Sequence, residues 1–198
     1  MVARRLPLLA VVGATALALA AATATFAVLD SGDNAPDQVS GPDAASSDGY
    51  RMAPAGELPR STSEVRLASL DGGPDATLGD LLTGRPVVVN FFASWCAPCV
   101  DEMPAFEAVH RSVGAKVTFV GMANRDSPED ARATVRTTGV SYPTYGDPDT
   151  SALTFFGGLQ MPTTVFIAPS GAVVDVANGA LTEGELRTKL ADLFGVAA

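Results

Sequence analysis

Cys96 and Cys99 are the only cysteines of this 198-residue chain, and two residues separate them. A disulfide that closes so short a loop removes little entropy from the unfolded chain, so it would add little to stability. The spacing does allow the two sulfurs to meet across one helical turn, where a disulfide can open and close without refolding. The pair therefore predicts thiol–disulfide exchange, in which a thiolate attacks a disulfide and forms a mixed disulfide.

The cysteines stand where a buried strand is expected to give way to a helix. Residues 87–92 form a short, β-branched apolar run, and residues 98–113 carry apolar side chains at helical spacing. Unpaired N–H groups at a helix N-terminus lower a thiol pKa from about 8.5 to between about 3.5 and about 7.5. We predict that Cys96 is the exposed nucleophile and Cys99 the buried resolving thiol. Half of a zinc site is the alternative, but its other ligands would have to be His110 or carboxylates.

Residues 64–198 have the pattern of one α/β domain. Strands are expected at residues 65–67, 87–92, 117–122, 163–168 and 173–177. Helices are expected at residues 98–113, 127–139, 150–156 and 182–194. The first strand has the alternation of an edge strand, and the last two are expected to form a hairpin. This order predicts a mixed β-sheet with helices on both faces.

The N-terminal part of the chain has the layout of an export signal or a membrane anchor. Residues 6–29 carry no charged side chain and follow Arg4 and Arg5. Positive charge before an apolar run keeps the arginines inside and exports the rest of the chain. Small residues would allow cleavage, whereas the length of the run suffices to cross a membrane. We therefore expect residues 1–29 to be a signal peptide or a membrane anchor, with the remainder extracytoplasmic.

Composition separates that segment from the domain and excludes one class of partner. Residues 30–63 are rich in proline, glycine, serine and aspartate, which predicts a disordered linker. The chain has 22 acidic against 13 basic residues and a net charge of −9, so nucleic acid is not an expected partner. An exported compartment tolerates disulfides, so a dithiol kept reduced there must receive electrons from elsewhere.

The sequence around the cysteines resembles a known family. Residues 91–99, FFASWCAPC, resemble the active-site stretch of thioredoxin-like proteins. With Glu102 and Pro104 after them, they are similar to the TlpA/ResA group of thiol–disulfide oxidoreductases. Residues 161–164, MPTT, resemble the family's cis-proline segment. The resemblance implies a thioredoxin fold, a central mixed β-sheet flanked by helices, following the N-terminal signal or anchor segment.

The resemblance also implies residues that bind substrate. In the family, the residue before the cis-proline pairs its backbone with the extended chain of the substrate, beside the sulfurs. Met161 would make this contact here, and Pro162 would hold the loop open. Trp95, directly before Cys96, completes the expected substrate-binding residues.

Two further residues bear on proton transfer. Thioredoxin has a buried aspartate six residues before the first cysteine, where this chain has Asn90, and an amide cannot take a proton from a thiol. Glu102, one turn beyond Cys99, occupies the place of the acidic residue in the ResA-like group. We predict that Glu102 assists the deprotonation of Cys99. The alternative is a solvated acid on the first turns of the helix.

The predicted activity is thiol–disulfide exchange on exported proteins, with no cofactor and no metal. The resemblance suggests the haem-site cysteines of apocytochrome c as substrates and a membrane thiol transporter as electron donor. A disulfide-forming oxidase is the alternative, although residues 97–98 lack the histidine that strongly oxidising relatives often have there. A peroxiredoxin is a further alternative, but it would be expected to have threonine or serine three residues before its peroxidatic cysteine, where this chain has Ala93. A non-catalytic interaction or metallochaperone module would not need both cysteines.

Overall fold

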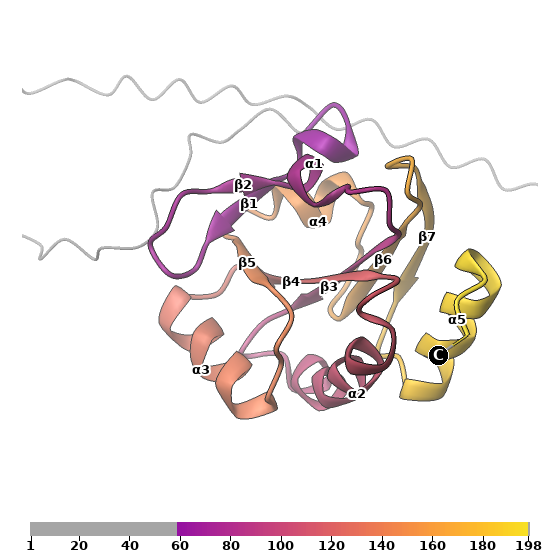
Figure 1. The fold of residues 1–198 in the computed structure, drawn as a ribbon. Helices are drawn as coiled ribbons and strands as arrows, with labels where there is room; N and C mark the ends of the chain where they lie inside the picture. The colour runs from indigo at the N-terminus through magenta and orange to yellow at the C-terminus, as the bar shows by residue number, and fades with distance from the viewer. Residues whose placement is uncertain (1–58, 198) are drawn as a thin grey trace, which may run out of the picture. The chain divides into compact units, whose positions relative to one another are not determined.

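The computed structural model describes residues 59–197, which form one mixed β-sheet with helices around it (Figure 1). The seven strands of these residues lie in the order β2-β1-β5-β4-β3-β6-β7. They are β1 (Arg66–Ser69), β2 (Ala76–Thr77), β3 (Val87–Phe92), β4 (Thr118–Asn124), β5 (Thr144–Asp147), β6 (Thr163–Ile167) and β7 (Val173–Asn178). The neighbours β3, β4 and β5 are parallel, and the other pairs are antiparallel.

Helices cover both faces of this sheet. They are η1 (Thr62–Glu64), α1 (Leu78–Leu81), α2 (Ala97–Val113), α3 (Pro128–Thr138), α4 (Ser151–Phe155) and α5 (Glu183–Phe194). The helices α2 and α3 lie on one side of the sheet and α1 and α4 on the other (Figure 1), while α5 packs against α2. The predicted mixed α/β sheet with helices on both faces is confirmed.

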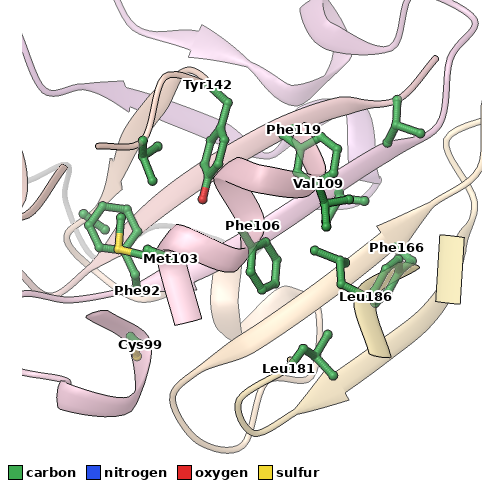
Figure 2. Packing of buried hydrophobic residues seen from close by; sticks show 14 of the residues in the cluster. Phe92, Cys99, Met103, Phe106, Val109, Phe119, Tyr142, Phe166, Leu181 and Leu186 are labelled. Carbon is green, nitrogen blue, oxygen red and sulfur yellow. The ribbon is translucent and has the colours of Figure 1, made fainter. Parts of the chain in front are cut away.

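The central strand β3 explains why one polar side chain is directed beneath α2. All six of its residues are buried, as expected for a strand covered on both faces. Val88 and Phe92 belong to a core cluster to which α2 contributes Met103 and Phe106 (Figure 2). Alternate residues of a strand point to the same face, so Asn90 enters this layer as well. A polar group thus lies inside a mainly apolar layer.

The ends of the helices follow local sequence signals. The Ser127 side chain accepts a hydrogen bond from Asp130 N at the start of α3, and Gly139 ends that helix with a φ of 74°. Thr182 and Glu185 form a capping box at the start of α5. These helices begin and end where the sequence predicts.

Other parts of the fold differ from the sequence-based expectation. β1 is not an edge strand, since β2 and β5 flank it on either side. The short elements β2, α1 and β5 were not predicted, because their two to four residues are too few to display a period. Within residues 59–197, no helix is long and apolar enough to cross a membrane. The expected signal or anchor at residues 1–29, and most of the expected linker, lie outside the described residues.

Candidate active site

The two cysteines form a disulfide at the junction between β3 and α2. Their sulfur atoms are bonded, their Cα atoms lie 5.3 Å apart, and Cys96 is the N-cap residue of α2. Cys99 is fully buried, as predicted. The predicted exposure of Cys96 is wrong for this disulfide form: the residue is only 6% exposed, because its sulfur is bonded to that of the buried Cys99. Cys96 is still the more accessible of the two.

A loop after β4 fastens the segment that precedes the disulfide. Asp126 accepts hydrogen bonds from Ser94 N at 2.6 Å and from Ser94 Oγ at 2.7 Å, and Trp95 Nε1 donates to the Arg125 carbonyl at 3.2 Å. No sequence-based prediction gave residues 124–126 a role. The sequence did offer a signal for this contact. Because the parallel strands β3 and β4 end at the same edge of the sheet, the segments that follow them lie close together.

Glu102 is buried beside Asn90, one helical turn from Cys99. Asn90 Nδ2 donates to Glu102 Oε1 at 2.8 Å, and Leu181 N donates to Glu102 Oε2 at 2.8 Å. Burial raises the pKa of Glu102 to about 7, against the opposing effect of these two hydrogen bonds. Only 4% of the residue is exposed, which excludes the alternative of a solvated surface acid.

The residues expected to bind substrate lie in two segments, one directly before Cys96 and one directly before β6. The peptide bond between Met161 and Pro162 is cis, as in the segment that the family resemblance suggested. Met161 and Trp95 line one pocket of about 480 Å³. Trp95 is 60% exposed, which is unusual for so large an apolar side chain. The structure therefore brings Trp95, directly before Cys96, and Met161, directly before the cis-proline, to the same pocket.

Residues 59–197 contain no group of three or more His, Cys, Asp or Glu side chains that could hold a metal ion. The arrangement that they do contain is a dithiol pair, a buried acid with a pKa near neutral pH, and an exposed aromatic side chain. This set is suited to the exchange of a disulfide with another protein.

Comparison with known proteins identifies the family. The model of the AhpC/TSA family matches residues 51–176. The chain belongs to this family. The thiol-disulfide oxidoreductase ResA of Bacillus subtilis is 33% identical over 105 residues, which are 52% of this chain and 58% of ResA. The thiol:disulfide interchange protein HelX of Rhodobacter capsulatus is 31% identical over 134 residues, 66% of this chain and 73% of HelX.

Among solved structures, that of MTB DsbF in its mixed oxidised and reduced forms is similar to this family member. The two are 33% identical with a TM-score of 0.61, over 69% of this chain and 99% of the other. The thioredoxin fold and the TlpA/ResA-type resemblance are thereby confirmed. This AhpC/TSA-family protein is a thiol–disulfide oxidoreductase, with the disulfide between Cys96 and Cys99 as its redox-active bond.

The Asp126 carboxylate is expected to stabilise the segment before the disulfide. In Asp126→Asn an amide NH2 group replaces one of the two carboxylate oxygens that accept from Ser94 N and Ser94 Oγ, so one of these two hydrogen bonds is lost. We expect the free energy of unfolding of the oxidised protein to fall by about 1–3 kcal/mol. Urea denaturation measures this change. Asp192→Asn, at an exposed position of α5, is the matched control and should change it by less than about 0.5 kcal/mol. Equal stabilities of the two variants would contradict the assigned role.

Proposed function

We propose that this oxidoreductase reduces disulfides of exported proteins outside the cytoplasm. The observation that carries the proposal is the position of Glu102, buried one turn beyond Cys99 at the start of α2. The reaction uses Cys96 as the attacking thiol, Cys99 as the resolving thiol and Glu102 as the proton acceptor.

The first step is an attack by the reduced Cys96. Its thiolate is stabilised by the N-terminus of α2, where backbone N–H groups lack helical partners. The thiolate attacks one sulfur of a substrate disulfide, so the substrate S–S bond breaks and a mixed disulfide forms with Cys96. The second substrate sulfur leaves as a thiolate and takes a proton from solvent.

The second step releases the substrate. Cys99 loses its proton to Glu102 and attacks the Cys96 sulfur, which forms the Cys96–Cys99 disulfide and expels the first substrate sulfur as a thiolate. Two electrons have then passed from the dithiol to the substrate. An acid with a pKa of about 7 is suited to this role, because it is partly ionised near neutral pH and can both take and return a proton.

Asn90 orients the proton acceptor. Its amide donates to Glu102 Oε1, and the Leu181 backbone donates to the other carboxylate oxygen. These contacts fix the carboxylate without supplying a positive charge that would prevent its protonation. Asn90 is therefore a positioning residue, whereas thioredoxin has an acid at that place in the sequence.

Substrate is held beside the sulfurs by the residues that the family resemblance indicated. Met161, before the cis-proline Pro162, pairs its backbone with the extended substrate chain, and the exposed Trp95 covers the other side. The apolar run after Arg4 and Arg5 supports export, with residues 1–29 either kept as an anchor or removed. By resemblance to the ResA group, the substrates include haem-site cysteines of apocytochrome c, and a membrane thiol transporter returns the electrons.

The equilibrium reduction potential of the Cys96–Cys99 pair tests the direction of the reaction. We expect a value near that of thioredoxin, about −270 mV, for a reductant supplied with electrons. A value near about −120 mV would instead indicate a disulfide-forming oxidase, the second candidate. The measurement uses the full chain in detergent, equilibrated with dithiol buffers. An insulin-reduction assay on the same sample separates both enzymes from a non-catalytic module, which would not reduce insulin.

A further inference from the structure

We propose that the pocket beside the disulfide binds an extended peptide segment with an acidic side chain next to the reacting cysteine, and so selects among substrate proteins. We call it the side pocket. The inference rests on the proposed function, because its ligand is the substrate of Cys96. The side pocket is lined by Trp95, Asn124, Arg125, Thr150, Leu153, Gly158, Leu159, Gln160 and Met161.

Backbone conformation and hydrogen bonds fix the walls of the side pocket. Within residues 59–197, the non-glycine residues with positive φ are Arg125 at 48° and Thr150 at 61°, and both line the pocket. Such conformations are costly and occur preferentially at ligand-binding segments. On the other wall, Leu159 N donates to Asn178 Oδ1 at 3.1 Å, which holds the loop before the cis-proline in place.

The lining has an unpaired cation. Arg125 is exposed, is the one charged residue among those that line the side pocket, and has no ion pair within the part of the chain that the structure describes. The chain as a whole has a net charge of −9, so a lone arginine beside the disulfide is a local exception to its electrostatics. A carboxylate on the substrate is the group that complements it.

The lining also has an unpaired buried amide and an apolar rim. Asn124 is only 3% exposed, and its Oδ1 is buried with no hydrogen-bond partner among residues 59–197. An unsatisfied buried acceptor is costly, and a backbone N–H of a bound peptide would supply the missing donor. Trp95 is 60% exposed and Leu159 88% exposed, so both can cover apolar parts of the same peptide.

These features together favour one kind of occupant. An extended peptide supplies an N–H for Asn124, apolar surface for Trp95 and Leu159, and a fixed distance between its cysteine and its neighbours. An acidic side chain at a neighbouring position then meets Arg125. The acidic side chain of the peptide must lie close to Arg125, because the net negative charge of the whole protein repels an acidic partner at longer range.

The test uses the reduced full chain and a set of peptide disulfides. Each peptide carries one cysteine in a disulfide with a small neutral thiol. Glutamate, glutamine or lysine stands one or two residues before or after that cysteine. Trp95 is the only tryptophan and adjoins Cys96, so its fluorescence follows oxidation of the dithiol. The rates are measured at pH 7 and low salt. Arg125→Gln is the test variant. Arg136→Gln, which removes another exposed arginine outside the side pocket, is the charge-matched control.

We expect one of the glutamate peptides to oxidise the natural protein about fourfold faster than its glutamine analogue, as for an exposed ion pair. Arg125→Gln should bring this ratio to about one, and Arg136→Gln should leave it unchanged. Asn124→Ala should slow both peptides by the same factor, about threefold, because each loses the same backbone hydrogen bond.

The opposite results separate the two proposals. Equal rates for all peptides, a preference that survives Arg125→Gln, or unchanged rates in Asn124→Ala would overturn the side pocket as a selective site and leave the reductase function standing. If none of the peptide disulfides oxidises the natural protein, the proposed function fails and the inference fails with it.

Discussion

The Cys99→Ala variant is expected to stop at the mixed disulfide and to lose insulin reduction by about 10³-fold or more. Oriented groups in one molecule react with effective molarities of about 10⁵ M or more, and the variant must instead await a thiol from solution. Cys96 lies at the N-terminus of α2 and is the more accessible residue of the pair, so it should remain able to attack. The stalled adduct should be isolated under non-reducing conditions and its site identified by mass spectrometry.

Cys96→Ala is the matched control for this prediction. It removes the attacking thiol, so both turnover and the mixed disulfide should disappear. The buried Cys99 should not replace it, because its side chain has no access to solvent. A mixed disulfide on Cys99 in the Cys96→Ala variant would reverse the assigned roles. Full turnover by Cys99→Ala would show that Cys99 is not the resolving thiol.

Glu102→Gln is expected to slow release of the substrate from Cys96 by about 10²-fold at pH 7, the lower range for general acid–base catalysis. Glutamine keeps the shape and can still accept from Leu181 N, but it cannot take a proton from Cys99. The pH dependence should change with the rate. In the natural protein the rate of release should rise through a pKa of about 7, and this inflection should be absent in the variant.

The same variant should alter the pH dependence of stability. Burial raises the pKa of Glu102 from 4.5 to about 7, so the folded protein binds this proton more tightly than the unfolded chain does. The resulting stability is fully present below about pH 4.5 and is lost as the pH rises through about 7, a loss of about 3 kcal/mol. Urea denaturation at pH 5 and pH 8 measures this loss of stability. The oxidised protein is used because its cysteines form a disulfide and do not titrate.

Asp101→Asn provides the control for both measurements. Asp101 is the exposed neighbour of Glu102 on α2, so the substitution removes one carboxylate from the same helix without touching the buried one. It should leave the pH profile of substrate release and the loss of stability between pH 5 and pH 8 unchanged. A Glu102→Gln protein that behaves like Asp101→Asn would show that Glu102 takes no part in proton transfer.

The sequence by itself determined the central strand, the helix with the cysteines and the capped helices. The apolar run of β3, the spacing of α2 and the caps at Ser127 and Thr182 are all encoded by residues a few positions apart. Local patterns of this kind act within one turn or one strand, so they can be recognised without knowing the fold. The short β2 and β5 gave no such pattern, since they are stabilised by pairing with strands elsewhere in the sheet, and the short α1 packs against η1 and β2.

Only the tertiary structure decided how the site is completed. Glu102 is fixed by the Leu181 backbone, 79 residues further along the chain, and Ser94 is held by Asp126 across 32 residues. Arg125 and Asn124 reach the side pocket because β4 ends beside β3. Contacts between such distant residues leave no spacing in the sequence. The burial that sets the pKa of Glu102 and the unpaired groups of the side pocket exist only once the sheet has brought these segments together.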